Sequence, residues 1–154
     1  MNTMNIRFAG LGGMGVLKAS DVFAELVFRQ SFDVKKAEVH GMSQRGGSIS
    51  SDVRYGEAVS SPMIPEGECD ILVVMEATQI DVVKSCLKAD GVLIVPADID
   101  ATKLPSSKAL NVAMLGRLSK ILPFSVEMWH EALRSQFAQK LWAGNEIAFQ
   151  LGRE

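Results

Sequence analysis

The sequence has few of the residues that mark several classes of protein. Its 154 residues include two cysteines, one tyrosine and two tryptophans. Cys69 and Cys86 lie far apart in the sequence and in unlike contexts, so they predict no disulfide framework, no zinc site and no ligand set for an iron–sulfur cluster. No apolar run approaches the roughly 18 residues that span a bilayer. Residues 1–5 lack the charged and apolar regions of a signal peptide. We therefore expect a cytoplasmic chain without a membrane partner.

A strong charge of one sign is also missing. The formal net charge is -2, the sequence pI is about 5.7, and no run of basic residues alternates with aromatic ones, so nucleic acid is not an expected partner. Hydrophobic residues make up 47% of the chain, which is enough for a buried core. The length predicts one domain, residues 1–154, because no linker or repeat divides the chain.

Apolar periodicity predicts alternating strands and helices. The strands are expected at 4–9, 33–39, 48–55, 70–75 and 91–95. The helices are expected at 16–30, from a cap at Thr78 through Lys88, from a cap at Asn111 to about Leu122, from Val126 after a cap at Ser125, and over about 136–151. The strands at 33–39 and 48–55 are joined by a loop too short for a crossover helix, so they should pair antiparallel. The sequence predicts an α/β fold: one three-layer α/β/α domain with a mixed, mostly parallel sheet, a Rossmann-like opening and one antiparallel hairpin.

The stretch from Glu38 to Arg54 concentrates hydrogen-bonding side chains and glycines between two strands. Arg45 offers a planar set of donors suited to a carboxylate or phosphate, and His40 can titrate or hydrogen-bond near neutral pH. Both also have structural interpretations, an ion pair for Arg45 and a hydrogen-bonded histidine for His40, and these stay open. The candidate active-site or partner loop consists of His40, Ser43, Gln44, Arg45, Gly46, Gly47 and Ser48.

A second candidate is the glycine loop formed by Gly10, Gly12, Gly13 and Gly15. Its spacing and its place between a strand and a helix match the dinucleotide fingerprint, and Glu38 follows at about the distance of the ribose-binding acidic residue. The alternatives are a tight turn with close packing of helix on sheet, or contact with a protein partner. A dinucleotide-binding module built on residues 10–15 therefore stays open as an alternative function.

Several other residues have two interpretations each. Glu76 follows a buried strand, where α/β sheets place ligands, but a carboxylate at a helix start is the preferred interpretation. Arg54 is expected to be a solvated charge or an ion pair, and His130 a surface or packed histidine. Trp129 and Trp142 are candidates for an interface or for the core.

These motifs resemble the gamma-type subunit of 2-oxoacid:ferredoxin oxidoreductases. The run from His40 to Gly47 is most like that of the beta subunit of indolepyruvate:ferredoxin oxidoreductase, and the resemblance covers nearly the whole chain. Met14 stands where many members of the family have Gln. The motifs that carry the resemblance are Gly10-x-Gly12-Gly13-x-Gly15-Val16, Glu38-x-His40-Gly41-Met42-Ser43-Gln44-Arg45-Gly46-Gly47-Ser48, Val53-Arg54, Ser61-Pro62, Asp70-x-Leu72, Asn111, Met114-Leu115-Gly116, Leu122-Pro123-Phe124 and Asn145-x-x-Ala148-Phe149-x-x-Gly152.

The resemblance implies a subunit of an enzyme that oxidatively decarboxylates an aryl 2-oxoacid to an acyl-CoA and passes the electrons to ferredoxin. The chain has no cysteine cluster and no Gly-Asp-Gly signature for thiamine diphosphate. A larger partner subunit is therefore expected to hold thiamine diphosphate, Mg and the iron–sulfur clusters, with coenzyme A as co-substrate and no cofactor or metal bound by this chain. A purely structural adaptor, with no residue in any active site, is the third hypothesis.

Overall fold

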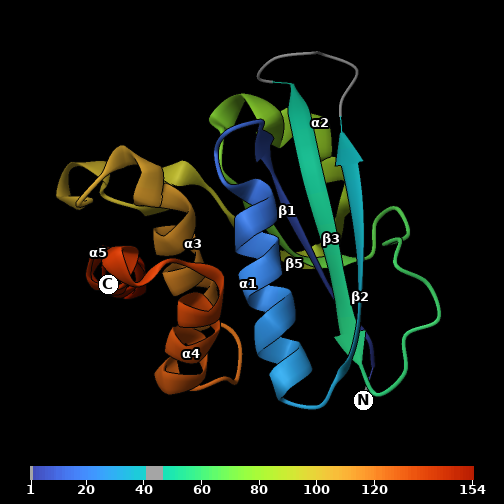
Figure 1. Ribbon diagram of the computed structural model, residues 1–154. Helices are drawn as coiled ribbons and strands as arrows, with labels where there is room; N and C mark the ends of the chain where they lie inside the picture. Colours follow the sequence, from blue (N-terminus) through green and yellow to red (C-terminus); the bar gives the residue numbers. More distant parts are fainter. Residues whose placement is uncertain (1, 41–46) are drawn as a thin grey trace.

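The computed structural model describes residues 2–40 and 47–154. Its centre is a sheet of five strands (Figure 1). Apolar residues on alternate or consecutive positions explain why these segments are extended, and the turns between them fall at glycine, proline and polar residues. The strands are β1 (Met4–Leu11), β2 (Asp33–His40), β3 (Ser48–Gly56), β4 (Cys69–Val74) and β5 (Leu87–Ile94).

The strand order is β2-β3-β1-β4-β5. β3 pairs antiparallel with both β1 and β2, whereas β1–β4 and β4–β5 are parallel. All strands except β3 therefore run in one direction, and their carboxyl ends meet at one edge of the sheet. This confirms the mixed α/β sheet and the antiparallel hairpin of the prediction.

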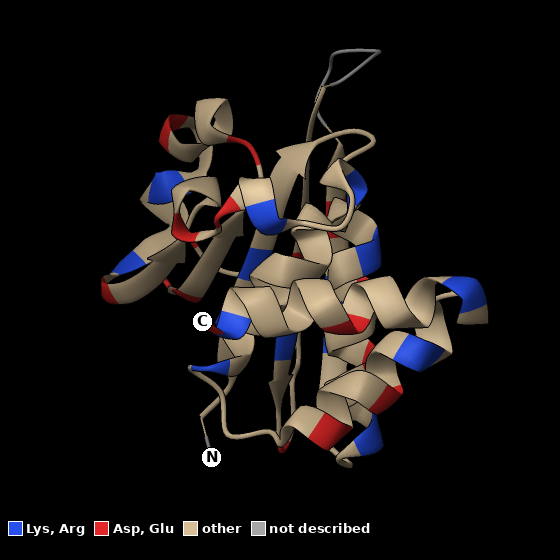
Figure 2. Cartoon of the chain, turned by 90° about the vertical axis from the view of Figure 1, so that its left-hand side faces the viewer, with Lys and Arg blue, Asp and Glu red and all other residues tan. Residues whose placement is uncertain are grey.

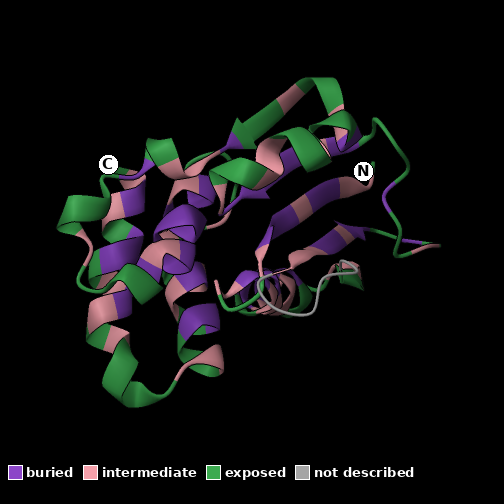
Figure 3. Cartoon of the chain, turned by 90° about the horizontal axis from the view of Figure 1, so that it is seen from above, coloured by how far each residue is buried: buried purple, intermediate pink, exposed green. Residues whose placement is uncertain are grey.

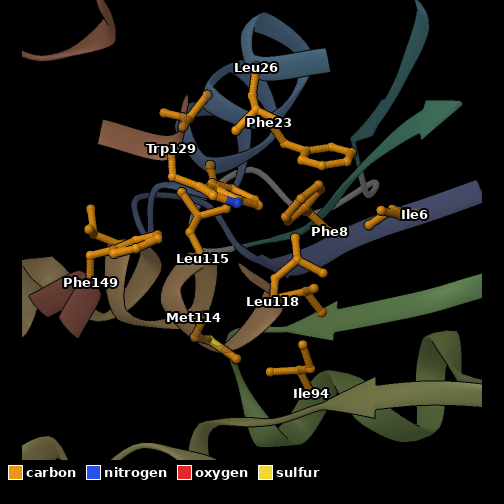
Figure 4. Packing of buried hydrophobic residues seen from close by; sticks show 14 of the residues in the cluster. Ile6, Phe8, Phe23, Leu26, Ile94, Met114, Leu115, Leu118, Trp129 and Phe149 are labelled. Carbon is orange, nitrogen blue, oxygen red and sulfur yellow. The ribbon is translucent and has the colours of Figure 1, made fainter. Parts of the chain in front are cut away.

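Four α-helices lie on one face of the sheet (Figure 1). The core between them and the sheet is rich in aromatic rings: Phe23 of α1 stacks on Trp129 of α4 with ring centroids 5.8 Å apart, and Phe8 of β1 lies beside Phe23 (Figure 4). Trp129 is thus a core residue. The four helices are α1 (Val16–Arg29), α3 (Leu110–Ser119), α4 (Val126–Gln136) and α5 (Trp142–Arg153).

Helices α3 and α5 pack so closely that glycine is needed at their contact. A Cβ on Gly152 would overlap the backbone carbonyl of Ala113, and one on Gly116 would overlap that of Phe149. These are two glycines of the C-terminal motifs noted in the sequence. They fix the place of α5 against the rest of the fold.

The other face of the sheet is covered by short segments. A smaller apolar cluster there contains Leu72, Val74 and both cysteines, with partly buried side chains from the 77–86 segment packed on it. The covering elements are the 3₁₀ helices η1 (Ala77–Gln79) and η2 (Lys84–Cys86) on either side of α2 (Ile80–Val83). Viewed along the sheet, buried residues concentrate between the layers and exposed ones lie outside (Figure 3).

Several predicted boundaries were wrong. The helix expected at 78–88 is replaced by η1, α2 and η2, and the strand expected to be buried at 91–95 is the edge strand β5, with Val92 39% exposed. The final helix, expected over about 136–151, begins later than predicted, because Gln136 is the last residue of α4 and α5 begins at Trp142. Three further 3₁₀ helices, η3 (Pro96–Asp98), η4 (Ala101–Lys103) and η5 (Ser107–Ala109), lead into α3, and η6 (Gln139–Leu141) leads into α5.

Two of the predicted caps were also wrong. Glu76, not Thr78, caps η1, since its Oε2 accepts from the Thr78 amide at 3.0 Å. Asn111 lies inside the first turn of α3 rather than before it. The Ser125 cap is confirmed: its Oγ accepts from the Met128 amide at 3.2 Å.

Candidate functional site at the carboxyl edge of the sheet

The glycine loop connects β1 to α1 at the carboxyl edge of the sheet. Gly15 has a left-handed backbone (φ 78°), and its carbonyl accepts from Ala19 at 3.0 Å and from the Asn111 side-chain amide at 3.3 Å. A Cβ on Gly15 would overlap that same amide. The glycine is therefore required both by its own backbone angle and by the close approach of α3.

Met14 folds back instead of pointing outward from the loop. Its Sδ accepts from the Leu11 amide at 3.4 Å, and its side chain packs on the main core. The loop accordingly presents backbone rather than a polar side chain at this position. Beside it lies a hollow of about 330 Å³ lined by Gly13, Met14, Gly15, Ser107, Lys108 and Leu110.

The candidate active-site or partner loop meets the glycine loop at the same edge. His40 ends β2 and is exposed, and residues 41–46, which include Ser43, Gln44, Arg45 and Gly46, lie outside the described residues. Immediately after residues 41–46, the Gly47 carbonyl accepts from the Gly12 amide at 3.0 Å. Ser48 Oγ donates to Gln79 Oε1 at 2.5 Å. The fold thus brings together two loops that are about 30 residues apart in the sequence.

The partner of Ser48, Gln79, was missed by the sequence analysis. Gln79 belongs to η1, which follows β4, and nothing in its sequence context distinguishes it from an ordinary helical Gln. Pairing of β1 with β3 on one side and β4 on the other is what places residues 11, 48 and 79 together. Open α/β sheets bind ligands at this kind of edge, outside the carboxyl ends of parallel strands.

The dinucleotide interpretation of the glycine loop conflicts with the strand order. In the dinucleotide-binding fold the acidic residue ends the strand next to β1. Here β3 lies between β1 and β2, so Glu38 is one strand further away, about 5 Å more than the motif requires. Glu38 also contacts Lys36, with Oε1 3.4 Å from Nζ. Glu38 therefore matches the motif by its position in the sequence, but in the fold it lies too far from the glycine loop to act as the ribose-binding residue.

Other residues singled out in the sequence have structural partners. Arg54 is not a solvated charge: its Nε donates to Asn5 Oδ1 at 2.8 Å, and its Nη1 donates to the carbonyls of Ser61 at 2.7 Å and Met63 at 3.0 Å. His130 packs edge-on against Phe149, with ring centroids 5.4 Å apart. Trp142 is half-buried, and its Nε1 donates to the Phe137 carbonyl at 2.9 Å.

The two cysteines, which lie far apart in the sequence, are neighbours in the fold. Both thiols are buried and free, and Cys69 Sγ donates to the Ile71 carbonyl at 3.1 Å. The neighbouring Cys86 thiol and burial raise the pKa of Cys69 well above its ordinary value. Parallel pairing of β4 with β5 explains the contact, because it places Cys69 opposite Leu87, the residue after Cys86.

An ion pair with a buried carboxylate supports the sheet from its other face. Arg7 Nε lies 2.6 Å from Oδ1 of Asp52, whose side chain is 2% exposed, and Nη2 lies 3.0 Å from Oδ2. The hydrogen bond to Asp52 raises the pKa of Arg7 above its ordinary value.

On the surface, residues of both signs are interspersed (Figure 2). Among the described residues, no group of three or more His, Cys, Asp or Glu side chains could hold a metal ion, and no helix has the length and apolar character of a membrane span.

Comparison with known proteins identifies relatives over the whole chain. The family model described as pyruvate ferredoxin/flavodoxin oxidoreductase matches residues 5–154. The indolepyruvate oxidoreductase subunit IorB of Thermococcus kodakarensis is 30% identical over 192 aligned positions, covering 99% of this chain and 95% of the relative. The protein of the same name from Archaeoglobus fulgidus is 28% identical, with coverages of 97% and 93%.

Solved structures share the fold at lower identity. The gamma subunit of a keto/oxoacid ferredoxin oxidoreductase from Geobacter sulfurreducens has a TM-score of 0.81 at 24% identity, covering 97% of this chain and 95% of that chain. The 2-oxoglutarate:ferredoxin oxidoreductase from Magnetococcus marinus has a TM-score of 0.83 at 19% identity, and the match covers 99% of this chain but 31% of that chain. The sequence match over residues 5–154 and the shared sheet together show that the chain belongs to the pyruvate ferredoxin/flavodoxin oxidoreductase family.

Proposed function

We propose that this chain is the accessory subunit of a 2-oxoacid:ferredoxin oxidoreductase of the indolepyruvate type. The observation that carries the proposal is the family match over nearly the whole chain, with relatives named as subunits of indolepyruvate oxidoreductases. The reaction would be oxidative decarboxylation of an aryl 2-oxoacid to an acyl-CoA, with electrons delivered to ferredoxin through the partner.

The proposal assigns the cofactors to a larger partner subunit. The chain has two cysteines, fewer than the four thiolates that hold a typical iron–sulfur cluster. Thiamine diphosphate, Mg and the clusters would therefore be bound by the partner, and coenzyme A would be the co-substrate. In the Magnetococcus relative, the matching region is under a third of a longer chain, which supports a close association of this domain with a larger one.

The site that we propose to face the partner is the carboxyl edge of the sheet. The Gly12–Gly47 hydrogen bond joins the glycine loop to the segment before β3, and the Ser48–Gln79 hydrogen bond joins β3 to η1. His40 lies exposed at the end of β2. We propose that Arg45 contacts an anion there, either the substrate carboxylate, a phosphate of coenzyme A or a carboxylate of the partner. A guanidinium suits each of these because its donors form a planar pair.

The first experiment is a tagged pull-down of the chain from its own cells, with co-purifying chains identified by mass. We expect a large chain with a thiamine diphosphate signature and cysteine clusters. Recovery of the chain alone and monomeric would remove the basis of the subunit assignment. Turnover of the recovered complex with indolepyruvate, pyruvate and 2-oxoglutarate then tests the substrate class, with the highest kcat/KM expected for indolepyruvate.

The second experiment is Arg45→Ala in the assembled complex, with Arg29→Ala as the matched control. Arg29 is an exposed arginine in the last turn of α1, where it pairs with Glu25. Loss of one charge-assisted hydrogen bond predicts a fall of about tenfold or more in kcat/KM for Arg45→Ala and no change for Arg29→Ala. If Arg45→Ala assembles and turns over normally, the chain is a structural adaptor and our site assignment is wrong.

A further inference from the structure

Cys69 and Cys86 form a pair of buried thiols on the face of the sheet opposite the four long helices. Cys69 begins β4, and Cys86 ends η2, one residue before β5. The parallel pairing of these strands sets Cys69 opposite Leu87, and neighbouring strands lie only about 4.8 Å apart. Both side chains belong to one apolar cluster with Leu72 and Val74. Strand pairing therefore brings together two cysteines that the sequence separates.

The sulfur atoms of the pair are close enough to act directly on each other. Each thiol is the largest influence on the pKa of the other, lowering it for Cys86 and raising it for Cys69. The Arg7 guanidinium also lowers the pKa of Cys86, whereas burial and the carboxylates of Asp52 and Glu66 raise it. Cys86 is therefore the thiol of the pair that ionises first, and the thiolate is the reactive form of cysteine.

Cys69 is suited to be the second partner in a disulfide. Its thiol keeps its proton, which it donates to the Ile71 carbonyl at 3.1 Å, and it lies beside Cys86. Among residues 2–40 and 47–154, no third His, Cys, Asp or Glu side chain joins the pair in a group that could hold a metal ion. A thiolate with a second thiol next to it is the arrangement that forms a disulfide when an oxidant arrives.

We propose that Cys69 and Cys86 are an oxidation site, at which hydrogen peroxide converts the two thiols into an intramolecular disulfide. The Cys86 thiolate would attack one peroxide oxygen and break the O–O bond, giving a sulfenic acid on Cys86. The hydroxide that leaves takes up the proton released by Cys86 and becomes water. The Cys69 sulfur would then displace the sulfenic hydroxyl, which leaves as a second water with the Cys69 proton, and the S–S bond forms. The two sulfurs lose two electrons, which reduce the peroxide.

The segment that covers the pair determines both the access of peroxide and the effect of the bond. The thiols lie under side chains of residues 77–86, so peroxide reaches them when this segment opens. The S–S bond would tie the end of η2 to the start of β4 and close a loop over residues 69–86. Gln79, which accepts from Ser48 at the carboxyl edge of the sheet, lies within that loop. Oxidation would therefore restrain the segment that supports the candidate site.

The test is treatment of the folded full chain with hydrogen peroxide, followed by urea and N-ethylmaleimide. Mass spectrometry should find no maleimide on the treated chain and, after digestion, one pair of peptides joined through Cys69 and Cys86. Reduction with dithiothreitol should restore both alkylatable thiols and lower Tm by about 5 °C or more, because it opens the closed loop. Dithiothreitol does not reverse methionine oxidation, so the same sample is its own control.

Three results would overturn the proposal. They are thiols that stay alkylatable after peroxide, cysteines that are oxidised without becoming joined, and a Tm that does not fall on reduction. The last of these would show that the bond does not fit the native fold. This inference does not rest on the proposed function, because the test uses this chain alone and needs no turnover.

Single variants separate the roles of the two thiols. Cys69→Ala leaves the reactive thiol without its partner, so peroxide should produce a sulfenic acid on Cys86 that dimedone traps. Cys86→Ala leaves only the thiol that keeps its proton, and dimedone labelling of Cys69 should be several-fold slower. Equal rates would show that Cys86 is not the attacking thiol. Where an alanine variant fails to fold, the peptide cross-link in the wild type still decides whether the site exists.

Discussion

Gly15 is the residue on which the glycine loop depends. Replacing it with alanine places a Cβ at a left-handed backbone position and against the Asn111 amide, so we expect a loss of about 2 kcal/mol in the free energy of unfolding. Gly12→Ala is the control, because Gly12 has open space around it. Thermal denaturation should show a lower Tm for Gly15→Ala and little change for Gly12→Ala. Equal shifts would mean that the loop relaxes around either substitution.

Ionisation of Tyr55 is expected to lower the free energy of unfolding at high pH. The ring is 1% exposed, and burial raises the pKa of its hydroxyl from 10.0 to about 12, with the negative charge of Asp70 adding to the effect. The unfolded chain therefore releases this proton before the folded one does. The stabilisation is complete below about pH 10 and is lost as the pH rises towards 12, a change on the order of 2–3 kcal/mol.

Urea denaturation of the wild type and of Tyr55→Phe across that interval measures this effect. The free energy of unfolding should fall more steeply with pH in the wild type than in the variant, which has no phenol to ionise. The difference between the two curves isolates Tyr55 from the lysines, which titrate in both proteins. Parallel curves would show that the Tyr55 phenol ionises equally in the folded and unfolded states.

At the scale of elements, the contact between α3 and α5 allows a comparison within one helix. Gly152→Ala forces a Cβ against the Ala113 carbonyl, whereas Gly144→Ala, in the same helix, meets nothing within 4 Å. We expect Gly152→Ala to destabilise the fold by about 2 kcal/mol or more. Gly144→Ala should stabilise it by about 0.5–1 kcal/mol through helix propensity. Opposite shifts in Tm are the expected result, and a gain from both changes would mean that α5 is free to move away from α3.

The elements that the sequence predicted well are those whose signal is local. The three- and four-residue spacing of Val16, Ala19, Val22 and Phe23 fixes α1, and the continuous apolar run of β4 fits a strand buried on both faces. The Ser125 cap is likewise a local pattern. Predictions failed where the deciding contact is distant in the sequence. β5 has the composition of a buried strand but lies at the edge of the sheet. Residues 77–86 form three short helical segments, η1, α2 and η2, on the face of the sheet opposite the four long helices.

The candidate site shows the same division between local and distant signals. The glycine loop and the residues on either side of segment 41–46 were identified from composition. The role of Gln79, the distance of Glu38 from β1 and the contact of Asn111 with Gly15 follow from strand order and helix packing. The distance between two motif residues on different strands, such as Gly12 and Glu38, depends on the order of the strands in the sheet, which the sequence pattern does not give. Arg45, Ser43, Gln44 and Gly46 lie outside the described residues, so their roles stay predictions.

At the scale of the whole molecule, the reactivity of the two thiols measures whether the sheet face that η1, α2 and η2 cover is intact. Cys69 and Cys86 are 0% and 1% exposed, so we expect a thiol reagent to modify neither in the folded protein and both after unfolding in urea. Since the cluster around them is covered by η1, α2 and η2, modification should occur at the rate at which that cover opens. Rapid labelling of one thiol in native buffer would show that this cover opens separately from the main core.

The position of β1 has a consequence for how the chain acquires its structure as it is made. β1 is made before the other four strands of the sheet but lies in its middle, and its neighbours, β3 and β4, end at residues 56 and 74. Both edges of β1 are therefore paired only after synthesis has reached residue 74, and such distant pairings form slowly. Until then an apolar strand with two open edges is present, which exposes the nascent protein to aggregation. Expression at a lower temperature, or together with chaperones that bind extended segments, would be expected to raise the soluble yield.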